Sequence, residues 1–223
     1  DSILLAHFVS LKPQARVIEL GSGSGIILLI LAKHFPRADF SGLEIQENLA
    51  NMARKNVKIN CLDNIVKIFS GDAKSAPNIF KASVFDAVIF NPPYRKLSSG
   101  RINQIREKAI ARHEIRGSLS VFLSAAKYLL KPAGKVFTVY PAKRLIELVS
   151  VFRENKIEPK RIKLVFSNFL SAAEFVLVEG RLGGREELKI EKPLFIYQID
   201  KTYTPEMDNV FSELACFPAD VGG

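Results

Sequence analysis

The feature that most constrains the fold is an alternation of short apolar runs with longer segments of helical periodicity. The apolar runs predict buried strands, and the segments between them predict helices. Such an order favours an α/β fold with a parallel sheet, because each helix carries the chain back across one face of the sheet. The predicted strands are Arg16–Leu20, Phe40–Leu43, Ile65–Phe69, Phe85–Phe90 and Val136–Tyr140, and the predicted helices are Ile26–His34, Gln46–Asn60, Leu119–Leu130 and Ala142–Asn155.

The pattern changes after the last of these helices. Arg161–Phe166 and Glu174–Val178 are close enough in sequence to form an antiparallel pair at the sheet edge, and Leu194–Gln198 is a candidate for a further strand. No internal repeat or linker divides the 223 residues. We therefore expect a single domain with a helical segment over residues 1–15, a core over 16–140, and a helix, edge hairpin and C-terminal extension over 141–223.

Composition and charge limit the class of protein. Hydrophobic residues make up 48% and charged residues 25%, as in an ordinary globular protein. The apolar runs are too short to cross a bilayer and no signal peptide is recognisable, so we expect a cytoplasmic protein with no membrane partner. Cys61 and Cys216 have no companions at metal-ligand spacing, which predicts no metal site. The net charge of +9 favours encounters with polyanions but leaves nucleic-acid binding open.

A glycine-rich turn follows the first predicted strand, in the segment Val17-Ile18-Glu19-Leu20-Gly21-Ser22-Gly23-Ser24-Gly25. Glycines let the main chain approach a ligand closely at the end of a strand. Ile26 stands where the dinucleotide fingerprint has its third glycine, so a pyrophosphate fits poorly. S-adenosylmethionine has no phosphate and carries two cationic groups, for which the acid Glu19 is useful. The alternative is a flexible Gly/Ser loop without a ligand.

Two further acids follow predicted strands. Glu44 ends the second strand, where its carboxylate can accept hydrogen bonds from both ribose hydroxyls of an adenosine. Asp72 follows the third strand, where it can accept one from the adenine amino group. For Asp72 a turn or a helix cap is an equally good interpretation.

The segment Asn91-Pro92-Pro93-Tyr94 ends the fourth predicted strand. The two prolines remove two N–H donors, which leaves the Asn91 side chain and the Pro92 carbonyl as acceptors for an NH2 group. Such bonds favour a pyramidal nitrogen that can attack a methyl sulfonium, and the Tyr94 ring can stack on a flipped base. Taken alone, the motif also fits a tight turn.

With these motifs in this order, the chain resembles the Rossmann-like class I methyltransferases that methylate amino groups. Within that group it resembles the bacterial tRNA adenine-N6 methyltransferases that modify an adenine next to the anticodon of a valine tRNA. Further segments that carry the resemblance are Asp1-Ser2-Ile3-Leu4-Leu5, Ala111-Arg112-His113-Glu114, Lys192-Pro193-Leu194 and Tyr203-Thr204.

The resemblance implies a mostly parallel seven-stranded sheet with an antiparallel hairpin at its edge and helices on both faces. It implies S-adenosylmethionine as cofactor and tRNA as partner. Members usually have a segment before the position of Asp1, which is absent here. The resemblance implies Gly21, Gly23, Gly25, Glu44 and Asp72 at the cofactor, and Asn91 and Tyr94 at the reacting amine. The residues themselves add Glu19 and Asn91 at the cofactor, Pro92 at the amine, and Pro93, Arg95, Lys96, Arg101 and Arg112 at the substrate.

Two basic clusters have alternative interpretations. The stretch after Tyr94 holds Arg95, Lys96, Arg101, Arg106, Lys108, Arg112 and Arg116 with only Glu107 and Glu114 as acids, so it is either a grip for phosphates or a solvated helical face. Lys156, Lys160, Arg161 and Lys163 leave the same choice open.

Other functions use the same motif. Release-factor glutamine methyltransferases also carry it, because a glutamine amide presents a planar NH2 group, but they have a helical domain before the glycine loop, where this chain has 18 residues before Glu19. Ribosomal RNA or DNA amino-methylation and a non-catalytic RNA-binding module are further alternatives. The sequence carries no prediction of oligomeric state.

Overall fold

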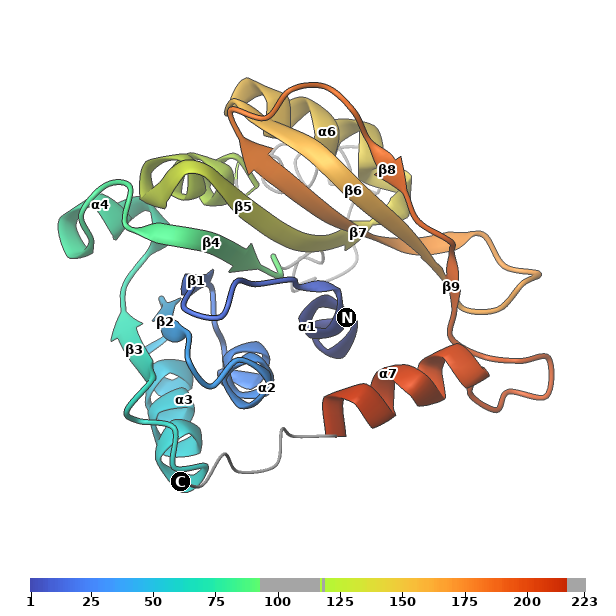
Figure 1. Ribbon diagram of the computed structural model, residues 1–223, viewed down its shortest axis with the longest axis horizontal. Helices are drawn as coiled ribbons and strands as arrows, with labels where there is room; N and C mark the ends of the chain where they lie inside the picture. The colour runs from blue at the N-terminus through green and yellow to red at the C-terminus, as the bar shows by residue number, and fades with distance from the viewer. Residues whose placement is uncertain (93–116, 118, 216–223) are drawn as a thin grey trace, which may run out of the picture.

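The computed structural model describes residues 1–92, 117 and 119–215, and their centre is one continuous sheet (Figure 1). Its strand order is β3-β2-β1-β4-β5-β7-β6-β8, and β9 pairs with β6 beside this path. The strands are β1 (Arg16–Leu20), β2 (Asp39–Glu44), β3 (Val66–Ser70), β4 (Phe85–Phe90), β5 (Leu130–Pro141), β6 (Ile157–Phe166), β7 (Ala173–Leu182), β8 (Lys189–Ile190) and β9 (Leu194–Phe195).

The directions of the strands confirm the predicted sheet. Strands β3, β2, β1, β4 and β5 are parallel, and β7 pairs antiparallel with both β5 and β6. The two-residue strands β8 and β9 both pair parallel with β6; β8 was not predicted, and β9 is the start of the candidate strand Leu194–Gln198. The predicted strand Leu194–Gln198 ends early, because the chain turns back at the Tyr197–Tyr203 bridge.

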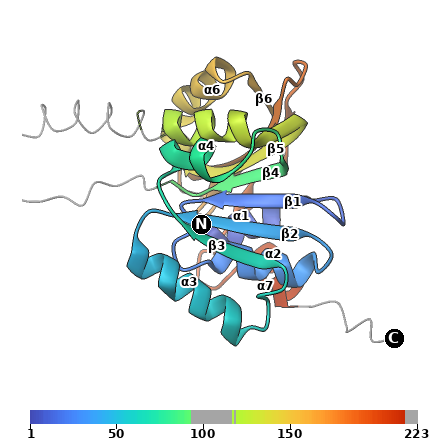
Figure 2. The same ribbon diagram turned by 90° about the vertical axis from the view of Figure 1, so that its left-hand side faces the viewer.

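Helices cover both faces of the sheet (Figure 2). On one face lie α1 (Ser2–Phe8), α2 (Ile26–His34), α3 (Glu47–Ile59) and α7 (Pro205–Ala215). On the other lie α4 (Ala76–Ile79), a helix over residues 119–129, and α6 (Leu145–Glu154). Short 3-10 turns, η1 (Ala73–Ser75) and η2 (Ala142–Arg144), precede α4 and α6. Within the described ranges, no helix has the length and apolarity needed to cross a membrane.

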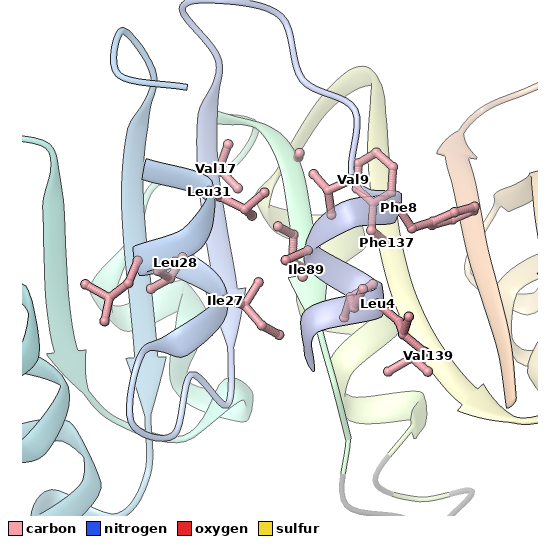
Figure 3. Packing of buried hydrophobic residues seen from close by; sticks show 14 of the residues in the cluster. Leu4, Phe8, Val9, Val17, Ile27, Leu28, Leu31, Ile89, Phe137 and Val139 are labelled. Carbon is pink, nitrogen blue, oxygen red and sulfur yellow. The ribbon is translucent and has the colours of Figure 1, made fainter. Parts of the chain in front are cut away.

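Strand alternation divides the core into two layers, because successive side chains point to opposite faces. Val17 and Ile89 pack with Ile27 of α2 and with α1 on one face (Figure 3). Ile18 and Val88 pack on the other face, against α6 and residues 119–129. A parallel sheet that is covered on both sides explains why its strands are apolar at nearly every position.

Two local predictions differ from the structure. Leu130, the last residue of the predicted helix Leu119–Leu130, begins β5 instead, and the pairing of β5 with β4 shifts register between Leu130 and Lys135, where Ala133 has φ 61°. Helix α7 was not predicted, although Met207, Val210, Phe211 and Leu214 have helical spacing after Pro205. The sheet nevertheless has the order that brings the candidate residues to one edge.

Candidate functional site

The predicted site residues follow four neighbouring strands at the carboxyl edge of the sheet. Leu20 of β1 is in register with Phe90 of β4 on one side and with Leu43 of β2 on the other. Glu44 of β2 is in turn in register with Ser70 of β3. The residues that come next, Asn91, Gly21, Ile45 and Gly71, therefore form a row along this edge, with neighbouring strands about 4.8 Å apart.

The glycine loop has the backbone conformation for which glycine is required. Gly21, Gly23 and Gly25 all have positive φ, at 73°, 54° and 84°. The Gly21 amide donates to the Leu43 carbonyl at 2.7 Å, and Gly25 is the N-cap of α2. A Cβ on Gly25 would also approach the Ala53 Cβ to 3.3 Å. The loop is thus a built turn and not a flexible Gly/Ser linker.

Glu44 binds the backbone of two loops through both carboxylate oxygens. The Gly23 amide donates to Oε2 at 2.8 Å, and the Gln46 amide donates to Oε1 at 2.9 Å. The side chain is buried. Glu44 therefore ties the glycine loop to the turn after β2, in addition to any ligand that it accepts.

Glu19 lies below the glycine loop and is only 2% exposed. Burial raises the pKa of this carboxyl well above its ordinary value, and the charge of Glu44 raises it further, while the Leu28 backbone amide in the first turn of α2 acts in the opposite direction. Glu19 Oε2 and the nearby Ser22 Oγ are buried without a hydrogen-bond partner in the described part of the chain. A polar or cationic group that reached either atom would satisfy it.

A cavity of about 590 Å³ opens beside the row of strand ends, within the size range of small-molecule sites. Asp72 lines it and also caps η1, since its Oδ1 accepts from the Lys74 amide at 3.0 Å. The cap interpretation of Asp72 is therefore confirmed, and its contact with the adenine amino group stays a prediction that its place on the cavity wall allows. The other lining residues are Gly21, Leu43, Ile45, Gly71, Ala73, Lys74, Gly117, Val121 and Phe122.

Three residues of this region were missed from the sequence. Ile45 is exposed on the cavity wall directly after Glu44, and that position was its only signal. Phe122 stacks on Phe90 with ring centroids 5.3 Å apart and lies against Gly21. Ser2 accepts a hydrogen bond from Asn91 Nδ2 at 3.3 Å, so α1 helps to orient this amide. Ser2 lies in the opening segment that carries the resemblance, but no role was predicted for it, and Phe122 carries no sequence pattern that marks it.

The structure describes only the beginning of the Asn-Pro-Pro-Tyr segment. Asn91 is half-buried at the end of β4, and Pro92 is buried. The remaining predicted substrate residues, Pro93, Tyr94, Arg95, Lys96, Arg101 and Arg112, lie outside the described residues, as does the rest of the basic stretch to Arg116.

The second basic cluster is largely paired within the fold. Arg161 forms ion pairs with Glu179 at 2.9 Å and Glu191 at 3.1 Å, and Lys163 pairs with Glu191 at 3.1 Å. Lys160 donates to the Arg185 carbonyl at 3.0 Å. These contacts favour a structural role for the cluster. Among residues 1–92, 117 and 119–215, no group of three acids, histidines or cysteines could hold a metal ion.

Comparisons with known proteins agree with this geometry. The model of the Methyltransferase small domain matches residues 1–154. A tRNA1(Val) (adenine(37)-N6)-methyltransferase of Porphyromonas gingivalis is 31% identical over 154 residues, 66% of this chain and 60% of the relative. The protein of that name from Aeromonas hydrophila is 29% identical over 206 residues, 92% of this chain and 84% of the relative.

The solved structures support the assignment of the fold and carry no evidence on the substrate. A predicted O-methyltransferase from Agrobacterium tumefaciens superimposes with a TM-score of 0.78 at 19% sequence identity, over 99% of this chain and 100% of that one. The match of the family model extends over more than half of the chain. The chain therefore belongs to the Methyltransferase small domain family, within the class I methyltransferases that depend on S-adenosylmethionine.

Proposed function

We propose that the chain transfers the methyl group of S-adenosylmethionine to N6 of an adenine in tRNA, near the anticodon. The observation that carries the proposal is the row of strand ends, in which Asn91 follows β4 beside the glycine loop that follows β1. An amine bound at Asn91 would lie next to a methyl donor bound at the loop. Holding the two reactants in this arrangement lowers much of the activation barrier of a direct displacement.

Asp72, which lines the cavity, and Glu44, which directly precedes the lining residue Ile45, suit this cofactor. Glu44 can accept hydrogen bonds from the ribose hydroxyls with its remaining lone pairs, and Asp72 can accept a hydrogen bond from the adenine amino group. The cationic groups of the cofactor are compatible with the buried acid Glu19 beneath the loop. The cofactor supplies a methyl group on a sulfonium, which an amine displaces directly.

The reacting amine needs help because its lone pair is delocalised into the adenine ring. Asn91 Oδ1 and the Pro92 carbonyl can accept hydrogen bonds from its two N–H groups, and these bonds favour a pyramidal nitrogen. Since an amide is planar, the bond from Asn91 Nδ2 to Ser2 Oγ directs Oδ1 away from α1. With the cofactor bound, the nitrogen would bond to the methyl carbon as the sulfur–methyl bond breaks, the sulfur would leave as the neutral thioether S-adenosylhomocysteine, and the nitrogen would lose a proton to solvent.

Two observations support tRNA as the substrate. Relatives that are 31% and 29% identical carry the name tRNA1(Val) (adenine(37)-N6)-methyltransferase. The net charge of +9 favours binding to a polyanion. The alignment with the Porphyromonas gingivalis relative spans 60% of that protein, so the activity of this chain needs a direct assay.

The test is transfer of a labelled methyl group to tRNA, ribosomal RNA and release factor in parallel. We expect label in tRNA, its loss in Asn91→Ala, and nearly unchanged cofactor affinity of that variant by calorimetry. Asn209→Ala, which removes an exposed amide from α7, is the matched control and should keep full activity. Label in release factor alone would refute the choice of substrate, and full activity of Asn91→Ala would refute the role of Asn91.

A further inference from the structure

Two turns extend beyond the carboxyl end of β6 on the same side of the molecule (Figure 1). One covers residues 167–172 between β6 and β7, and the other covers residues 196–204 between β9 and α7. The Tyr197 amide joins them by donating to the Ser167 carbonyl at 2.8 Å. Because β6 and β5 are both antiparallel to β7, this end of β6 lies at the same sheet edge as Asn91.

The two turns present apolar side chains to solvent. Phe169 is 57% exposed, Leu170 77% and Ile199 71%, and the rings of Tyr197 and Tyr203 are also exposed. We call these five residues the rim patch. Exposed large apolar side chains that gather at one place, rather than singly, are typical of a binding surface.

Hydrogen bonds hold the patch in shape. The Leu170 amide donates to Asn168 Oδ1 at 2.9 Å, and the Asn168 amide donates to Ser171 Oγ at 3.1 Å, which fixes the turn that carries Phe169. Tyr197 and Tyr203 stack with ring centroids 5.3 Å apart and an interplanar angle of 22°. Rings that are already ordered lose little entropy when a ligand binds to them.

The charges around the patch are balanced. Lys143 of η2 and Lys201 lie on this edge with the acids Glu174 and Asp200, and Asp200 Oδ1 accepts from the Thr202 amide at 3.0 Å and its hydroxyl at 2.6 Å. A surface that tracked phosphates would carry an excess of cations. Flat rings without such an excess suit the faces of nucleic-acid bases, which stack on aromatic side chains in single-stranded RNA.

The position of the patch fits a neighbour of the reacting base. Strands β5, β7 and β6 lie beyond β4 in the sheet, so the patch is three strand spacings, about 15 Å, from the line of Asn91. We propose that the rim patch stacks unpaired bases that flank the target adenine in a single-stranded loop of the RNA substrate. The inference rests on the proposed function, and it assigns recognition of the loop to residues outside the cofactor cavity.

The test compares Phe169→Ala with wild type for binding of a valine tRNA transcript across a salt series. Loss of one base stack predicts a dissociation constant about 5- to 150-fold higher, the equivalent of ~1–3 kcal/mol. The slope of log affinity against log salt should stay the same, because no phosphate contact is lost. Phe169→Tyr should bind the transcript with wild-type affinity, since it keeps the aromatic ring.

Two controls separate the patch from general damage. Ile59 at the end of α3 is 78% exposed and lies toward the opposite sheet edge, so Ile59→Ala should leave tRNA affinity unchanged. Cofactor affinity should be equal in all variants if they are folded.

The outcomes distinguish the patch from the proposed function. If Phe169→Ala binds tRNA as tightly as wild type, and wild type methylates tRNA, then base stacking on the rim patch is refuted and the proposed function is retained. Weaker tRNA binding by Phe169→Ala, in a protein that methylates no tRNA, supports the patch and refutes the function. Failure of wild type to bind tRNA overturns both. A further outcome concerns the oligomeric state in sedimentation. If wild type were a dimer, and Phe169→Ala were a monomer with unchanged tRNA affinity, the patch would be an interface between copies and the proposal would be overturned.

Discussion

Replacement of Glu44 by alanine tests whether the glycine loop is held in shape before any ligand binds. The variant removes the acceptor of two backbone amides, Gly23 at 2.8 Å and Gln46 at 2.9 Å. It also removes the carboxylate that we assign to the ribose hydroxyls. Stability and cofactor affinity should therefore fall together.

The magnitude follows from the number of bonds. A hydrogen bond to a charged group contributes about 1.5–3 kcal/mol. The lower value applies to each bond, because water can reach the freed amides through the adjoining cavity, so Glu44→Ala should lower the free energy of unfolding by ~3 kcal/mol. For a chain of this size that corresponds to a fall in Tm of about 6–12 °C. Glu44→Gln keeps one neutral acceptor and should lose roughly half as much.

Urea unfolding measures the stability, and calorimetry measures cofactor affinity, which should fall by ~1.5–3 kcal/mol for Glu44→Ala. The control is Glu47→Ala, because Glu47 is an exposed acid three residues later that pairs with Arg54 and should leave both quantities unchanged. An unfolding free energy of Glu44→Ala within about 0.5 kcal/mol of wild type would refute the account of the loop. Unchanged cofactor affinity would refute the ribose contact.

Two further variants test the buried parts of the fold. Because burial raises the pKa of Glu19, the folded state holds a proton that the unfolded state has lost above about pH 4.3. Wild-type stability should therefore fall as the pH rises from there through the raised pKa, and Glu19→Gln should remove this slope in urea unfolding; equal slopes would contradict the assignment. A Cβ on Gly180 would lie 2.5 Å from Phe152 Cε1 and 2.7 Å from Ile157 Cγ2, so Gly180→Ala should destabilise by ~1–3 kcal/mol. Phe152→Leu in the same chain should recover part of this loss, and simple addition of the two losses would count against the steric explanation.

Much of the site could be predicted because parallel strands bring their carboxyl ends to one edge. The apolar runs before Gly21, Glu44 and Asn91 were enough to identify these residues as strand ends. The register of β2, β1 and β4 then makes them neighbours, as the alternating pattern led us to expect.

The contacts of individual side chains were less predictable. The sequence left open that Arg161 binds phosphate, but in the fold its guanidinium forms ion pairs with Glu179 and Glu191. The bond between Asn91 and Ser2 joins residues that are 89 positions apart. No local pattern encodes such a pair, because it depends on how α1 packs beside β4 and not on either segment alone.

By itself the sequence determined the succession of strands and turns, and with it the polar residues at the carboxyl edge of the sheet, because hydrophobic periodicity and glycine conformation are local properties of the chain. Only the tertiary structure decided that Glu19 is buried, that Phe122 lines the cavity, and that the Tyr197 amide joins two turns distant in sequence at the same edge as Asn91. The physical reason is that burial and long-range contact arise from the packing of whole elements, which a short window of sequence does not contain.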